Sequence, residues 1–319
     1  MAVLGIDVSK AKCQCALRLD DGRVRQKSCP NTPAGFAELG AWLTKQGVAV
    51  VHAGLEATGT YGDAVAVWLH DAGHVVSVLN PAAVHAYANS RLSRTKTDRV
   101  DAVVIADFVA RQQPPPWVPP AREIRELQSL VRRLAVLQEM RTQEGNRLEA
   151  GVANAVVQRS IETMLATLET QITAVQQQIR DHIDRHPGLR QQRDLLVTIP
   201  GIADATAAVL IAELFDKRYT SARQAAAFAG VVPRLQESGT WRGRSRMSKL
   251  GPGRLRKALY FPALTALRWN PSIRPLRARL RAAGKPPMVI VGAAMRKLVH
   301  LAFGVLKSGR AYESTYAQP

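Results

Sequence analysis

The stretch VLGIDVSKAKCQCALRLDDGRVRQKSC, residues 3–29, decides the fold of the first part of the chain. VLGIDV at 3–8 has the composition of a short buried strand, and CQCALR at 13–18 alternates as a strand does. The pair Asp21-Gly22 is a tight-turn signal, and VRQKSC at 24–29 follows it as a partner strand. Three short strands with brief connections predict an antiparallel meander.

Strand and helix patterns alternate after the meander. Two further buried strands are expected, VAVVHAGLE at 48–56 and HVVSVLN at 74–80. Helices are expected at residues 35–46, 62–73 and 82–112, between and after these strands. The last of them has a polar interruption around 89–97. A meander followed by strand–helix crossovers predicts a mixed α/β sheet covered by helices.

The run QQPPPWVPP at 112–120 is an extended linker, because proline removes backbone donors and disfavours helix. We therefore predict a boundary here, with domains at 1–112, 113–188 and 189–319. After the linker the pattern is helical throughout, so the chain combines an α/β part with an all-α part.

A heptad pattern marks the middle of the chain. Apolar residues at 161, 165, 168, 172, 175 and 179 step alternately by four and three, with Glu and Gln between them. This spacing predicts an antiparallel helical hairpin or an intermolecular coiled coil that joins subunits. An ordinary amphipathic bundle helix is the third interpretation.

Positive charge is concentrated in the last part of the chain. The 319 residues hold 44 Lys and Arg against 25 acids, a net charge of +19. Residues 231–319 alone hold 18 basic residues and 2 acids, a net +16. Such an excess favours a polyanionic partner, above all nucleic acid, over a basic face that only aids solubility or an anionic membrane surface.

Composition excludes several classes of protein. Apolar residues make up 46% of the chain, which excludes disordered and collagen-like classes. The most apolar stretches, such as 298–306, are shorter than the ~18 residues of a membrane span, and no signal peptide is expected. Three cysteines (Cys13, Cys15 and Cys29) form no disulfide framework, which favours the reducing cytoplasm.

Four carboxylates are candidates for a metal centre. Asp7 lies inside an apolar strand pattern, where an acid costs desolvation unless a cation offsets it. Glu56 ends a second strand, while Asp98 and Asp101 share one face of a helix. Singly, each acid can be a solvated residue, an ion-pair partner or a helix cap. Together they suit Mg²⁺, which prefers oxygen ligands and serves phosphoryl transfer.

A basic segment is the second candidate site. Its cations are Arg234, Arg242, Arg244, Arg246 and Lys249, and Arg254 follows shortly after. Several glycines predict a flexible loop. Arginine forks suit a phosphate that gains charge in a transition state. Ser238, Ser245 or Ser248 is then a possible nucleophile, or all three only donate hydrogen bonds; residue types alone do not choose among them.

The turn Ile199-Pro200-Gly201-Ile202 joins two predicted helices. This is a helix-hairpin-helix pattern, in which Pro200 and Gly201 let the backbone approach a phosphate without reading bases. A plain turn between packed helices is the alternative. No zinc-site spacing and no GxxxxGK[ST] loop occurs, which argues against a zinc site and an ATP motor.

These motifs together resemble a known family. GIDVSK at 5–10, EATGTY at 56–61, VLNPAAVHAYA from 78 and KTDRVDA at 96–102 resemble the RuvC-like domain of the DEDD transposases of insertion sequence family one-ten. IPGI at 199, AAFAGVVPR at 226 and SGTWRGRSRMSKLGPGRLRKAL at 238 resemble the C-terminal transposase domain of that family. The pilin-gene invertases are similar and belong to the same group.

The resemblance implies an RNase H-like (RuvC-like) domain, a coiled-coil link and a helical transposase domain. It implies that Asp7, Glu56, Asp98 and Asp101 bind Mg²⁺, and that Ser238 is the nucleophile. It further implies donor and target double-stranded DNA as substrates, an element-encoded bridge RNA as guide, and a dimer or tetramer in which the acids of one subunit meet the serine of another. The expected place of action is the cytoplasmic nucleoid, with no membrane partner.

Three functions are weighed on this basis. In the first, a recombinase joins DNA through a phosphoserine at Ser238 and needs no ATP, because the covalent ester conserves the bond energy. In the second, a metal-only RuvC-like junction-resolving endonuclease uses the same acids with water as nucleophile. In the third, the chain binds nucleic acid without catalysis.

Overall fold

The computed structural model describes residues 1–57, 61–91, 97–215, 219–234, 237–239, 241–243 and 246–314, without the side chains of Glu237, Trp241 and Arg242. The chain divides into two compact units, Met1–Pro119 and Pro120–Pro319. The division falls inside the proline run, where residues 113–121 form neither helix nor strand. The finer division of the second unit at residue 188 stays a prediction.

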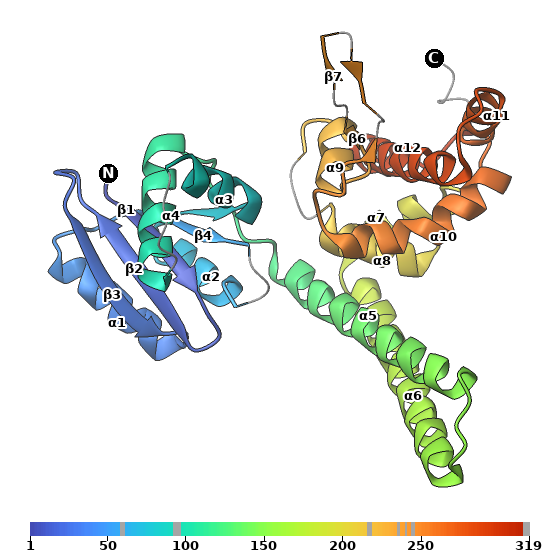
Figure 1. The fold of residues 1–319 in the computed structure, drawn as a ribbon, viewed down its shortest axis with the longest axis horizontal. Coiled ribbons are helices and arrows are strands. Elements are labelled where there is room, and N and C mark those ends of the chain that lie inside the picture. Colours follow the sequence, from blue (N-terminus) through green and yellow to red (C-terminus); the bar gives the residue numbers. More distant parts are fainter. Residues whose placement is uncertain are drawn as a thin grey trace. The chain divides into compact units, whose positions relative to one another are not determined.

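The first unit is a mixed sheet between two layers of helices (Figure 1). The sheet order is β3-β2-β1-β4-β5, in which β1, β2 and β3 pair antiparallel while β1, β4 and β5 pair parallel. The predicted α/β class with a meander and crossovers is therefore confirmed. The elements are β1 (Val3–Val8), β2 (Lys12–Arg18), β3 (Val24–Pro30), α1 (Pro33–Lys45), β4 (His52–Glu56), α2 (Asp63–Asp71), β5 (Val75–Leu79), α3 (Pro81–Ser90) and α4 (Asp98–Gln112).

Side chains along β1 alternate between the two faces of the sheet, and each face packs into its own hydrophobic core. Leu4 and Ile6 point into the core formed with α1 and α2, which also holds the three free, buried cysteines. Val3 points to the other side, into the core of α3 and α4. Because side chains two residues apart share a face, Asp7 lies on the face that α4 covers.

Gly5 lets α4 pack directly on the sheet. A Cβ at this position would lie 2.1 Å from the carbonyl oxygen of Ala102 and 2.4 Å from the backbone nitrogen of Ala106. Gly54 is the partner of Gly5 on β4, and a Cβ there would lie 2.3 Å from a methyl group of Val109. Because neither glycine has a side chain, α4 packs closely against the backbone of β1 and β4 at these two positions.

Gly5→Ala is expected to lower the stability of the first unit by at least about 2 kcal/mol, because the new methyl group displaces the α4 backbone. Thermal unfolding followed by circular dichroism measures the effect. Gly145→Ala, in a helix and with open space around it, is the matched control and is expected to be neutral or stabilising by about 1 kcal/mol. Equal melting temperatures for Gly5→Ala and the wild type would contradict this packing argument.

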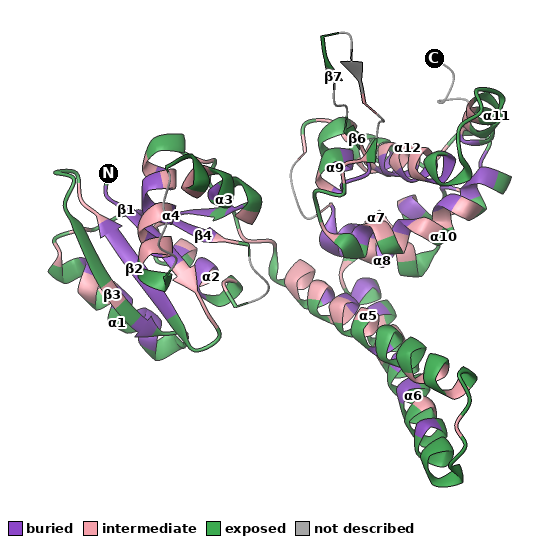
Figure 2. Ribbon diagram, viewed as in Figure 1, coloured by how far each residue is buried: buried purple, intermediate pink, exposed green. Residues whose placement is uncertain are grey.

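The second unit is helical, with a short β arm. Its helices are α5 (Arg122–Glu149), α6 (Ala155–Arg185), α7 (Pro187–Val197), α8 (Asp204–Glu213), α9 (Ala222–Phe228), α10 (Gly253–Trp269), α11 (Arg274–Ala282) and α12 (Pro287–Ser308). Helices α5 and α6 form a hairpin, in which Leu137 packs with Leu168 and Ile172 of the heptad seam. Its base joins the main core, where Leu127 and Ile183 are buried (Figure 2).

The basic segment contains short strands where the sequence predicted only a loop. β6 (Pro233–Arg234) pairs with β9 (Arg246–Met247), and β7 (Glu237–Ser238) pairs with β8 (Trp241–Arg242). Each strand is only two residues long, so no periodicity in the sequence predicts it. Backbone pairing therefore gives strand structure to the described residues of a segment whose composition predicted a loop.

The expectation that the most apolar stretches are shorter than a membrane span is wrong for helix α12. Among the described helices it alone is long and apolar enough to cross a membrane by length and composition. Its packing is that of a core helix, since Ile290, Met295, Leu298 and Ala302 are buried in the core of the second unit. The stretch 298–306 is only part of this helix, which begins at Pro287.

Candidate active site

Asp7 and Glu56 end neighbouring parallel strands. Gly5 aligns with Gly54 across the β1–β4 pairing, so Asp7 and Glu56, two residues further on, follow in register. Residues in register share a face, and adjacent strands run about 4.8 Å apart. Both half-buried carboxylates therefore lie on the α4 side of the sheet, at the edge where β1 and β4 end.

Asp98 and Asp101 reach the same edge from the first turn of α4. Thr97 caps this helix by accepting a hydrogen bond from the backbone N–H of Val100 at 3.3 Å. Lys12 Nζ lies 2.8 Å from Asp98 Oδ2. Because Lys12 begins β2, antiparallel to β1, it lies where β1 ends. The salt bridge thus locates the helix start beside Asp7.

The four acids offer the donor chemistry of a hard divalent cation. Two carboxylates come from the ends of β1 and β4 and two from the first turn of α4, and carboxylate oxygen is the ligand type that Mg²⁺ prefers. Within the described part of the chain, no three His, Cys, Asp or Glu side chains stand close enough to hold a metal ion. Asp98 instead pairs with Lys12, whose hydrogen bond and positive charge lower the pKa of the Asp98 carboxyl.

Ser238 lies at the tip of the β arm. It is exposed, it pairs with Trp241 across β7 and β8, and Gly239 follows it with φ +55°. The arm stands away from the helices of its unit (Figure 1). A hydroxyl on such a tip is accessible to a polymer substrate. Of the other two candidate serines, Ser248 lies at the base of the arm, where its N–H donates to the carbonyl of Val232, and Ser245 lies outside the described residues.

Two arginines face each other at the base of the arm. Arg234 faces Arg246 directly in the β6–β9 pairing, and both are exposed. Like charges opposite each other in a sheet are unfavourable unless an anion lies between them. Lys249 is exposed and has a φ of +56°, a conformation that side-chain-bearing residues rarely adopt. The Arg242 side chain and all of Arg244 lie outside what the structure describes.

Arg254 forms an ion pair with the buried carboxylate of Glu213. Glu213, at the end of α8, is 6% exposed, and its Oε1 accepts from Arg132 Nε at 2.7 Å. Arg254 Nη2 lies 3.5 Å from the same carboxylate and is half exposed. Glu213 thus orients Arg254 at the start of α10, immediately after the β arm.

The turn at Pro200 and Gly201 joins α7 and α8, as the helix-hairpin-helix pattern predicts. Gly201 has φ +109°, and a Cβ there would lie 2.9 Å from both Ala266 Cβ and the Pro262 carbonyl. Asn270 Nδ2 donates to the Pro200 carbonyl at 3.0 Å. Internal packing against α10 therefore accounts for the glycine. A phosphate contact at this turn stays a prediction.

Sequence reasoning missed a second polar cluster in the first unit. Asp107, in the middle of α4, is buried and accepts hydrogen bonds from Tyr87, Arg18 and Arg111, and it pairs with Arg91. The available signal was an acid in the middle of the apolar helix segment IADFVA. Arg111 follows Asp107 by four residues on the same helix, a spacing that favours an ion pair. Arg18, Tyr87 and Arg91 come from distant positions, and no spacing reveals them.

Family models match the chain in two consecutive parts. Residues 4–156 match the DEDD transposase model of the IS110 group, described as a transposase. Residues 193–277 match the transposase model of the IS116/IS110/IS902 family. The first match contains all four acids, and the second contains Ser238 and the basic segment.

Relatives agree with the models. The pilin gene-inverting protein of Moraxella bovis is 30% identical over 315 residues, which cover 97% of each chain. The corresponding protein of Moraxella lacunata is also 30% identical over 97% of both chains. A 43.6 kDa protein of insertion element IS110 from Streptomyces coelicolor is 28% identical over 50% of this chain and 38% of its own length.

Similarity over nearly the whole length, with two transposase models in the expected order, shows that the chain belongs to the IS110 transposase family of DNA-cleaving recombination enzymes.

Proposed function

We propose that this chain is a site-specific recombinase that cuts and rejoins DNA through a phosphoserine at Ser238. The observation that carries the proposal is the exposed Ser238 hydroxyl, which follows Arg234 by four residues on an arm where Arg234 faces Arg246. Two guanidinium groups opposite each other suit a phosphodiester, whose charge increases as a nucleophile attacks. A hydrolase that uses water needs no such hydroxyl.

In the proposed step the Ser238 Oγ attacks a DNA phosphorus. An Oγ–P bond forms and one P–O bond to a deoxyribose breaks. The serine proton passes to solvent water, and the departing deoxyribose oxygen takes up a proton from solvent water, so the step leaves the number of protons unchanged. Rejoining reverses the step with a new DNA hydroxyl as nucleophile, so the ester energy is conserved and no ATP is needed.

We assign Asp7, Glu56, Asp98 and Asp101 as the residues that hold Mg²⁺. The support is their common edge and their uniform carboxylate chemistry. When bound, Mg²⁺ supplies positive charge to the oxygens of the reacting phosphate. In the structure Lys12 forms a salt bridge with Asp98, and its positive charge offsets part of the negative charge of the four acids.

We further propose a homo-oligomer, a dimer or a tetramer, in which the acids of one subunit act with Ser238 of another. The acids and Ser238 belong to separate folded units, which suits such an exchange. The α5–α6 hairpin carries the exposed apolar side chains of Val136, Met140 and Met164. Exposed apolar side chains grouped on one hairpin favour contact with another subunit.

A bridge RNA is proposed as guide, with donor and target double-stranded DNA as substrates in the nucleoid. The support is basic surface beyond the β arm. Helix α11 contains Arg274, Arg277, Arg279 and Arg281 and no buried residue, so it presents its cations to solvent. Surface of this kind suits a second polyanion beside the DNA that Ser238 attacks. The proposed contacts at Pro200, Gly201, Lys249 and Arg254 complete the nucleic-acid interface.

The experiment is to trap the adduct. The wild-type protein is incubated with Mg²⁺ and a DNA substrate that carries a nick near the cleavage site, so that rejoining fails. After denaturation and nuclease digestion, mass spectrometry of the peptides is expected to locate a nucleotide on Ser238. Free DNA ends without adduct would instead support the metal-only junction-resolving endonuclease. DNA binding without Mg²⁺-dependent breakage would support a noncatalytic binder.

A further inference from the structure

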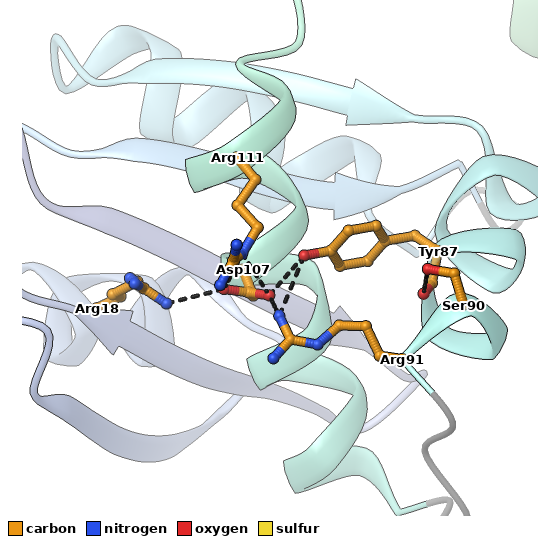
Figure 3. A network of polar contacts seen from close by, with 6 residues as sticks. All are labelled: Arg18, Tyr87, Ser90, Arg91, Asp107 and Arg111. Carbon is orange, nitrogen blue, oxygen red and sulfur yellow. Dashed lines mark hydrogen bonds and ion pairs between the residues drawn. The ribbon is translucent and has the colours of Figure 1, made fainter.

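In the first unit the buried carboxylate of Asp107 forms ion pairs with three arginines. Asp107 is 7% exposed. Its oxygens accept from Tyr87 Oη at 2.5 Å, from Arg18 Nη1 at 2.8 Å and from Arg111 Nε at 3.1 and 3.2 Å, and Arg91 Nη1 completes the cluster (Figure 3). The donors come from β2, α3, the residue after α3 and α4 itself. Packing of β2, α3 and α4 therefore places the cluster.

The cluster is not electrically balanced. Three guanidinium groups surround one carboxylate, and guanidinium does not lose its proton in proteins. The cluster therefore carries an excess of about two positive charges, and these charges repel one another at short range. One arginine and Tyr87 would satisfy the hydrogen bonds that hold Asp107 in place. The excess is the property of a site that receives an anion from outside.

The arginines are open to such an anion. The side chains of Arg18, Arg91 and Arg111 are 36%, 46% and 57% exposed, although they converge on a buried oxygen pair. Arg18 and Arg91 turn one terminal nitrogen to Asp107, and Arg111 turns its Nε. Because each guanidinium carries five N–H donors, donors remain on the solvent side of each group.

The cluster shares helix α4 with two of the proposed metal-binding acids. Arg18 pairs with Val3, so the cluster lies at the opposite end of β1 from Asp7. Asp107 lies on the same helix as Asp98 and Asp101, about 13 Å along the axis from Asp98. A strand that lies along α4 therefore has phosphates within reach of the cluster while another phosphate reaches the acids.

We propose that Arg18, Arg91 and Arg111, oriented by Asp107, bind a backbone phosphate of nucleic acid. The phosphate contributes position and affinity and carries no base sequence. The inference rests on the nucleic-acid substrate of the proposed function. It is independent of the phosphoserine step, since binding is measured in EDTA without cleavage.

The test uses the full-length protein with Arg111→Gln, which leaves Asp107 with Tyr87 and two arginines. Binding of a labelled DNA duplex and of an RNA hairpin of equal length is measured against salt concentration. With at least one of the two polymers, we expect the slope of log affinity against log salt to decrease by about one, and affinity at low salt to fall several-fold. The polymer affected identifies the source of the phosphate. Arg91→Gln is expected to reproduce the result.

Arg25→Gln is the matched control, because Arg25 is an exposed arginine of the same unit on β3. It is expected to leave the slope unchanged. Unchanged slopes for Arg111→Gln and Arg91→Gln with both polymers would overturn the proposal. An equal decrease with Arg25→Gln would also overturn it, since diffuse charge would then explain the effect. Thermal unfolding verifies that each variant is folded.

Discussion

Ser238→Ala is expected to form no covalent link to DNA and to reduce strand exchange by at least about a thousandfold, as removal of a nucleophile does. Alanine removes only the hydroxyl oxygen from an exposed hairpin tip, so folding and DNA binding are expected to be retained. Denaturing electrophoresis of labelled DNA after incubation with Mg²⁺ measures both the adduct and the cut strands.

Ser248→Ala is the matched control. Ser248 belongs to the same basic segment, but its backbone N–H is bound to Val232 at the base of the arm. This variant is expected to form the adduct at a rate close to that of the wild type. An adduct in Ser238→Ala, or its loss in Ser248→Ala alone, would show that a different serine is the nucleophile. Cut strands without adduct in Ser238→Ala would favour water as nucleophile.

Asp7→Asn is expected to reduce DNA cleavage by at least about a thousandfold while DNA binding persists. Asparagine has nearly the same shape as aspartate, so the centre of the sheet keeps its packing. It removes one of the negative charges that we propose to hold Mg²⁺ at the edge shared with Glu56. Single-turnover cleavage measured over a range of Mg²⁺ concentrations tests the prediction. Glu56→Gln is expected to behave alike.

Asp71→Asn, at the exposed end of α2, controls for the loss of one negative charge in the same unit. It is expected to cleave as the wild type does. Cleavage by Asp7→Asn within tenfold of the wild-type rate would exclude Asp7 from the metal-binding set. Because Ser238 is unaltered in this variant, the result separates failure of the acids from failure of the nucleophile.

Most of the first unit could be predicted because strand alternation and turn residues are local. The meander through Asp21-Gly22 and the strand β5 lie where the pattern places them, whereas β4 begins only at His52, inside the strand predicted for residues 48–56. The short strands of the basic arm could not be predicted. Two-residue strands have no period, and the β6–β9 pairing joins Arg234 to Arg246 across the whole of the arm between them.

The candidate site was predictable in its residue types and less so in its contacts. An acid inside an apolar strand marks Asp7, and spacing within one helix joins Asp98 to Asp101. The Lys12 salt bridge, the Arg234–Arg246 pairing and the packing of Gly201 on α10 depend on tertiary neighbours. No linear spacing encodes these contacts.

The amino-acid sequence by itself determined the α/β and helical composition and the concentration of cations after residue 231, and it marked four acids as candidate metal ligands, because periodicity, charge and motif are local properties. The tertiary structure alone decided that Gly5 and Gly54 bring α4 onto the sheet, that Asp7 and Glu56 share a face there, and that Asp107 gathers three arginines. The physical reason is that register and helix docking join residues far apart in the chain, and the free energy of those contacts exists only after folding.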